Sequence, residues 1–140
     1  MHHLLRRYGC GAALALALFG GPGVAQDAAL RPTPDYFAAA IFDMSMAQAL
    51  ARSCAAISVD PVRSGQRAEA LLEDLSEDGF DTSAPQEQMD NPEGAIEVLQ
   101  LEFVARYDLD TPGEEQVCEV ARAEMSEASG IGQLLVEVPG

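Results

Sequence analysis

The chain has 140 residues, with 23 acidic side chains and eight arginines but no lysine, and its formal net charge is −15. This length suits one domain of ordinary size. A surface with this charge repels the phosphates of nucleic acids and the headgroups of anionic membranes. We therefore expect no nucleic acid among its partners.

The first 26 residues show the three zones of a secretory signal peptide. Arg6 and Arg7 supply positive charge, residues 12–19 form an apolar run, and residues 20–26 offer small residues for cleavage. The apolar run is shorter than the roughly 20 residues that span a bilayer. We predict that residues 1–25 are a cleaved signal peptide, with a cut after Ala28 as the alternative, and that the mature chain has no stable membrane insertion.

Cleavage changes the chemistry that remains. Removing 25 of the 140 residues leaves 115, and these keep six arginines and all 23 carboxylates, for a net charge of −17. His2, His3 and Cys10 leave with the signal. The acidic surface would attract basic partners, although such a surface also serves simply to keep a protein in solution. The signal predicts a periplasmic or secreted location.

Four capping residues stand directly before a proline, which is typical of the start of a helix. Apolar residues recur at helical spacing after each pair. In the last pair, Glu114 follows Thr111 by three residues and predicts a capping box. We predict an all-α, four-helix domain at residues 34–140, after an extended N-terminal segment at residues 26–33. The pairs are Thr33-Pro34, Asp60-Pro61, Asn91-Pro92 and Thr111-Pro112.

Glycines followed by an apolar residue predict where two helices end. Gly79-Phe80 and Gly130-Ile131 each fit a C-terminal turn in which the apolar side chain folds back on the helix. Residues 81–90 lack apolar periodicity and form the longest predicted loop. Residues 134–138 fit either a short helical turn or a strand-like tail. Alternating strand patterns are otherwise missing, which argues against a β-sandwich.

The mature chain keeps two cysteines, Cys54 near the end of the first predicted helix and Cys118 early in the fourth. Exported proteins reside where disulfides persist, so this even pair predicts an inter-helix disulfide. The alternative is a reactive or metal-binding thiol pair. That alternative lacks both the C-x-x-C spacing and a histidine in the mature chain.

The acidic stretch 74–81 resembles the start of a calcium-binding loop. The match to an EF-hand then fails, because Pro85 stands where the loop needs a bidentate glutamate. The other interpretation is an acidic helix end closed by glycine. The residues that fit the first half of the loop are Asp74, Ser76, Asp78 and Gly79.

Absent residue types limit the enzymatic chemistry of the mature chain. Without histidine or lysine, it has no Ser-His-Asp or Cys-His site, no Schiff base and no histidine-ligated zinc. Paired carboxylates could still hydrolyse glycosides. However, 23 carboxylates on a small chain form close pairs by chance. We predict that the protein is not an enzyme and uses no cofactor or metal.

The C-terminal third carries the most distinctive motifs. Residues 118–125, CEVARAEM, and residues 129–135, SGIGQLL, resemble a bacterial exported family named domain of unknown function 5333. The segment Arg52-Ser53-Cys54 is similar to the first cysteine segment of that family. The resemblance implies a periplasmic location and a helical fold, and it implies no activity.

The resemblance also draws attention to Arg122, four residues after Cys118 and on the same face of the fourth predicted helix. A guanidinium buried beside the disulfide must be paired or bonded to carbonyls. Arg122 would then bind a ligand, or it would be a structural clamp on helix ends or on the neighbourhood of Glu124. We favour the clamp.

The charge and the missing catalytic residue types together favour a non-enzymatic binding or accessory protein that meets a basic protein of the envelope. One alternative is a structural or stress-related envelope protein without a defined ligand. A carboxylate-based hydrolase is the least favoured alternative.

Overall fold

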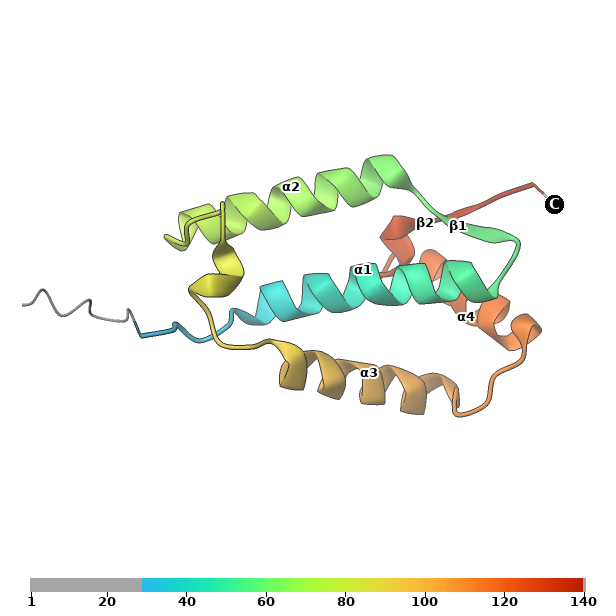
Figure 1. Ribbon diagram of the computed structural model, residues 1–140. Helices are drawn as coiled ribbons and strands as arrows, with labels where there is room; N and C mark the ends of the chain where they lie inside the picture. Colours follow the sequence, from blue (N-terminus) through green and yellow to red (C-terminus); the bar gives the residue numbers. More distant parts are fainter. Residues whose placement is uncertain (1–28, 140) are drawn as a thin grey trace, which may run out of the picture.

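The computed structural model describes residues 29–139, and the predicted signal peptide at residues 1–25 lies outside them. These residues form four α-helices, as predicted, and α1 lies between α2 on one side and α3 on the other (Figure 1). Helix α4 packs against α1 at the end where α1 finishes. The helices are α1 (Asp35–Ser53), α2 (Pro61–Glu77), α3 (Glu93–Tyr107) and α4 (Glu114–Glu127).

The helix start predicted at Asp60-Pro61 is confirmed, whereas α1 and α3 each begin one residue later than predicted, with Pro34 and Pro92 as their N-caps. Asp60 caps α2, because its side chain accepts hydrogen bonds from the backbone N–H groups of Val62 and Arg63, and proline stands at the first helical position. At α3, the side chain of Asn91 accepts a hydrogen bond from the N–H of Glu93 at 3.0 Å. Each of these side chains satisfies an N–H that has no partner within its helix.

The capping box predicted at Thr111 is wrong. Helix α4 begins three residues later, at Glu114, and its N-cap is Gly113. Glycine costs about 1 kcal/mol inside a helix relative to alanine but is acceptable at the N-cap, so the helix starts after it. The side chain of Glu114 instead accepts a long hydrogen bond, 3.5 Å, from the N–H of Ala55.

The helix end predicted at Gly79-Phe80 is confirmed. Gly79 has a φ of 78°, and the N–H of Phe80 donates to the carbonyl of Leu75 at 2.9 Å. The Phe80 side chain folds back and is buried. The corresponding turn of α4 lies two residues before Gly130, at Ala128, whose φ is 49°.

Two short strands pair antiparallel beside the helices. Strand β1 (Ile57–Val59) follows α1, and strand β2 (Leu135–Glu137) lies near the C-terminus, with Ile57 opposite Glu137 and Val59 opposite Leu135. The turn of 3₁₀ helix η2 (Gly132–Leu134) precedes β2. The C-terminal segment therefore combines the two expected conformations, first a helical turn and then a strand.

Two apolar clusters form the core, one at each end of α1. The larger cluster joins the second half of α1 to α3, α4, the strands and η2, around Phe42, Phe103 and Leu135. The smaller cluster joins the first half of α1 to α2, with Phe80 and Met89 added from the following loop. Both clusters contact α1, so this helix is the centre of the fold.

Gln88 closes the predicted loop at residues 81–90. Its side-chain oxygen accepts from the N–H of Asp81 at 2.9 Å, and its amide nitrogen donates to the carbonyls of Asp81 and Ala84. A 3₁₀ turn, η1 (Pro85–Glu87), and the buried Met89 complete it. Met89 also forms a parallel bridge with Arg31, so the loop fixes the N-terminal segment next to the start of α3.

Candidate functional site

Helix α3 has two apolar faces, and only one of them is covered. The covered face carries residues at positions i, i+3, i+7 and i+11, which pack on the larger core cluster. The other face has a second stripe at i, i+4, i+7 and i+11, on the opposite side of the helix. The covered residues are Ile96, Leu99, Phe103 and Tyr107. The exposed stripe is Gly94, Val98, Leu101 and Ala105.

The covered face fixes the position of α3. Phe103 meets Phe42 of α1 edge to face, with ring centroids 6.0 Å apart, and meets Tyr107 at 5.0 Å. The carbonyls of Tyr107 and Asp108 at the helix end both accept hydrogen bonds from the side-chain amide of Gln116. These contacts hold the helix and leave its other side toward solvent.

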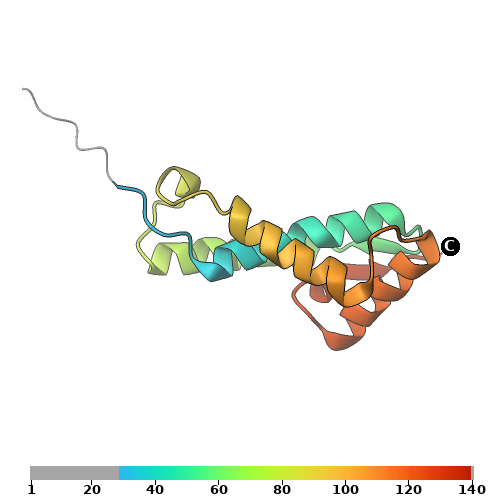
Figure 2. The ribbon, with the colours of Figure 1, turned by 90° about the horizontal axis from the view of Figure 1, so that it is seen from below.

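We name Val98, Leu101 and the three glutamates around them the outer α3 face. Val98 is 53% exposed and Leu101 is 63% exposed. Figure 2 shows α3 in front of the other helices, with no described segment across its outer side. Glu93 and Glu97 lie along one edge of the stripe and Glu102 along the other, and all three are exposed.

A cleft of about 510 Å³ adjoins the outer α3 face at the start of the helix. Its wall combines the apolar side chain of Ile96 with the carboxylates of Glu93 and Glu97. Exposed apolar surface beside negative charge suits a partner that offers apolar side chains together with arginine or lysine. The arrangement fits binding, and it places no nucleophile beside a base.

A second polar group lies beneath α3, around the buried Glu124. This side chain, 1% exposed, accepts hydrogen bonds from the hydroxyls of Tyr107, at 2.6 Å, and Ser129. Arg106 approaches it to 4.0 Å. Burial and then the hydrogen bond to Glu124 raise the pKa of Tyr107 to about 12. Glu124 thus ties together α3, α4 and the turn that follows α4.

Asp43 of α1 shares a cleft of about 210 Å³ with Glu124. Burial raises the pKa of Asp43 above its ordinary value of 3.8, and the negative charge of Glu124 raises it further. Arg67, with its nearest nitrogen 3.9 Å from the carboxylate, acts in the opposite direction. The sequence singled out Glu124 only as a neighbour of the expected Arg122 clamp, and it did not single out Asp43, since no motif or spacing connects positions 43 and 124.

The structure places Arg122 differently from the expected buried clamp. Its side chain is 50% exposed, and its Nε donates to Glu137 of β2 at 3.0 Å. Glu124, on the buried side of the same helix, bonds to Tyr107 and Ser129 instead. Positions 122 and 124 are about 200° apart around a helix, which explains why one side chain points outward and the other inward.

The predicted disulfide between Cys54 and Cys118 is present. It links the residue directly after α1 to α4, with the two Cα atoms 5.2 Å apart. Cys54 is fully buried in the larger core cluster. The bond therefore closes the end of the molecule at which α1, β1 and α4 meet.

The acidic stretch 74–81 is the end of α2 and its capping turn. Asp74 and Ser76 are helical, and the carboxylate of Asp78 accepts a hydrogen bond from the hydroxyl of Tyr36 at 2.7 Å. Within residues 29–139 no group of three or more acidic, histidine or cysteine side chains is arranged to hold a metal ion. None of the helices in this part of the chain is long and apolar enough to cross a membrane.

Sequence reasoning missed the outer α3 face, although its signal was present. The spacing of residues 94, 98, 101 and 105 is helical and mirrors the stripe that packs on the core. A helix that is apolar on two opposite sides can pack on both, and within residues 29–139 only one apolar side of α3 is covered.

Comparison with known families gives one match over most of the chain. A family model described as Family of unknown function (DUF5333) matches residues 30–136, which include all four helices and both cysteines of the disulfide. No curated protein matches, and no solved structure matches.

Proposed function

This chain belongs to the family of unknown function DUF5333, and we propose that it is a non-enzymatic binding protein of the bacterial envelope. Its partner is a basic protein that docks on the outer α3 face. The observation that carries the proposal is the uncovered apolar stripe of α3, which stands among carboxylates. Exposed apolar side chains at helical spacing are typical of surfaces that receive another protein.

Charge supports a basic partner rather than a second copy of the chain. Two copies docked through this face would bring Glu93, Glu97 and Glu102 against the same residues of the other copy. Like charges opposed in an interface cost free energy, and the net charge of the chain adds long-range repulsion. A partner with apolar side chains and flanking arginines or lysines would cover the apolar stripe and pair with the glutamates along its edges.

The disulfide supports a location outside the cytoplasm, because such bonds persist in oxidising compartments. The signal-like first 26 residues agree with export. The non-enzymatic part of the proposal follows from the residue types. After cleavage the chain has neither histidine, the most frequent general base, nor lysine, the usual amine nucleophile.

The test is a quantitative pull-down from envelope extract with the immobilised mature chain. The double variant Val98→Ser/Leu101→Ser removes the apolar stripe without changing charge, and it should reduce recovery of a specific basic protein at least tenfold. The matched control Val62→Ser/Leu72→Ser removes two exposed apolar side chains from α2 and should leave recovery unchanged.

Charge gives a second arm of the experiment. Glu97→Gln/Glu102→Gln should weaken the same interaction and reduce its dependence on salt, because added salt screens exposed charges. If no basic protein distinguishes the stripe variant from the α2 control, the proposed function is wrong. Circular dichroism melts of each variant show that the fold is retained.

A further inference from the structure

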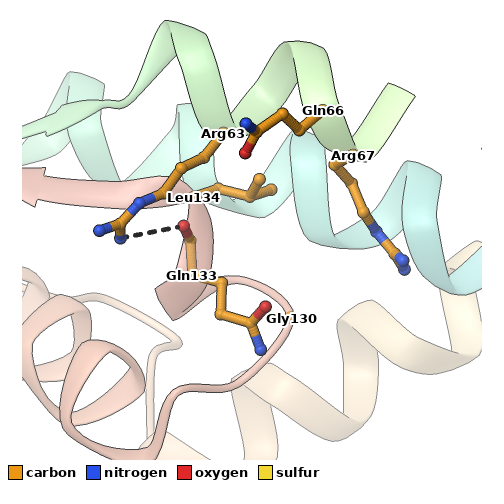
Figure 3. A pocket seen from close by; sticks show the side chains of 6 residues that line it. All are labelled: Arg63, Gln66, Arg67, Gly130, Gln133 and Leu134. Carbon is orange, nitrogen blue, oxygen red and sulfur yellow. Dashed lines mark hydrogen bonds between the residues drawn. The ribbon is translucent and has the colours of Figure 1, made fainter. Parts of the chain in front are cut away.

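A separate cleft of about 570 Å³ lies between α2 and the C-terminal segment. One wall is formed by Arg63, Gln66 and Arg67 of α2, and the other by Gly130, Gln133 and Leu134. Figure 3 shows the guanidinium group of Arg63 beside Gln133, in the segment that contains η2, whereas the side chain of Arg67 extends in a different direction. Helix α2, which carries one wall of this cleft, lies on the opposite side of α1 from α3 (Figure 1).

The cleft offers hydrogen-bond donors whose present partners are distant. Arg67 comes no closer than 3.9 Å to the carboxylate of Asp43, which is an ion pair without a hydrogen bond. Arg63 lies 3.4 Å from Asp60 and donates at 3.4 Å to the carbonyl of Gln133. The contacts of both arginines are therefore long. An oxyanion that accepts hydrogen bonds from these guanidinium groups at about 2.8 Å would bind them more strongly than their present partners do.

Each guanidinium group has one nearby carboxylate, at 3.4 Å or more. Asp60 uses Oδ1 to accept from the N–H groups of Val62 and Arg63 at the start of α2, and its Oδ2 lies 3.4 Å from Nε of Arg63. The Asp43 side chain is 16% exposed, and the nearest nitrogen of Arg67 stays 3.9 Å from its carboxylate, which is too far for a hydrogen bond. Gln66, between the two arginines in the sequence, adds an amide that can donate or accept.

The two guanidinium groups do not converge on one point. In Figure 3 they extend toward opposite ends of the cleft, with the side chain of Gln66 between them. We propose that the cleft binds a small ligand with two separated oxyanion groups, one held by Arg63 and one by Arg67. Arginine pairs carboxylate and phosphate oxygens through two parallel N–H groups, so either oxyanion has the required chemistry.

Titration calorimetry on the mature chain tests this proposal at about 0.15 M salt, which screens the repulsion between an anion and the acidic surface. The probes are succinate, glutarate and adipate, with butyrate as the single-carboxylate reference and glycerol 1,3-bisphosphate as the phosphate arm. At least one diacid should bind tenfold more tightly than butyrate. If the bisphosphate binds more tightly than every dicarboxylate, phosphate is the oxyanion for which the cleft is suited.

Three variants check the assignment. Arg63→Gln and Arg67→Gln should each weaken binding of the best diacid at least tenfold. Arg52→Gln removes the same charge from α1, outside the cleft, and should leave the affinity within twofold of the original chain. Absence of heat with every probe at 10 mM ligand overturns the proposal. Equal affinities for butyrate and the diacids also overturn it, as does equal loss in Arg52→Gln and Arg67→Gln.

Discussion

Gly132 shows how closely the C-terminal segment approaches α4. A β-carbon at this position would overlap the carbonyl of Glu124. The N–H of Gly132 also donates to the hydroxyl of Ser129 at 2.9 Å, and that hydroxyl donates to Glu124. The φ of Gly132 is not positive, so its backbone conformation does not require glycine. Glycine is required here because the backbone of α4 lies too close to leave room for a β-carbon.

Gly132→Ala should destabilise the protein by about 3 kcal/mol or more, because the overlapping atoms are backbone and can move little. Gly65→Ala is the matched control, since a β-carbon at this exposed position of α2 meets nothing within 4 Å. It should stabilise the protein by about 1 kcal/mol, the helix preference for alanine over glycine. Urea unfolding measures both free energies, and a neutral Gly132→Ala would contradict the packing argument.

Asp43 predicts a dependence of stability on pH. Its pKa in the folded protein is raised by burial, so as the pH climbs above the ordinary value of 3.8 the folded state holds a proton that the unfolded state releases. The free energy of unfolding therefore falls through that window. Asp43→Asn should raise the melting temperature at pH 7, and the advantage should disappear near pH 3.

The control for this effect is Asp110→Asn, which removes the same charge from an exposed loop. Any acidic protein gains some stability when its self-repulsion falls. The gain from Asp43→Asn at pH 7 must therefore exceed the gain from the control. A lower melting temperature for Asp43→Asn would mean that the ion pair with Arg67 outweighs the cost of burial.

At the scale of elements, helix ends were the least predictable features. At Asp60-Pro61 and at Gly79-Phe80 the residues that start or stop the helix stand directly at its end, and both predictions are confirmed. At Thr111, the following Gly113 delays the helix, and at Gly130 the glycine serves a close approach to Asp43 instead of a left-handed turn. Local sequence could not show the second role, because position 43 is distant in the chain.

The backbone conformation at the end of α4 lowers the stability of the protein. Ala128 adopts a left-handed conformation, and its N–H and that of Ser129 bond back to the carbonyls of Met125 and Glu124. An alanine in this conformation costs about 1 kcal/mol relative to glycine. Ala128→Gly should raise the free energy of unfolding by about that amount. Thermal unfolding measures it, and Ala123→Gly, inside the helix, should change stability in the opposite direction.

At the scale of the whole molecule, the sequence predicted the helix count and the disulfide, gave a strand-like tail at residues 134–138 as one of two alternatives, and did not predict β1 or its pairing. Four proline-marked starts gave the helix count, and an even cysteine pair gave the bond. Strands β1 and β2 have three residues each, too few for an alternating pattern to be recognised, and they pair across more than 70 positions. The sequence also did not predict the cleft between α2 and the C-terminal segment, because its two walls are far apart in the chain.

The disulfide should supply a large share of the stability of the molecule. It joins positions 64 apart, and restriction of the unfolded chain by a loop of this size contributes about 4 kcal/mol. Cys54→Ala/Cys118→Ala should lower the free energy of unfolding by a similar amount. Urea unfolding with and without reductant measures this. The original chain should lose stability in reductant, and the double variant should be insensitive to it.

The pairing of β1 with β2 also fixes when folding can finish. Synthesis from the N-terminus supplies α1 and β1 first, yet η2 and β2, which cover the core, exist only once residues 132–137 have been added. Until those residues emerge, α1 lacks part of its packing, and the long-range contacts that complete the fold cannot form. The native structure is thus reached only once residues 132–137 are available.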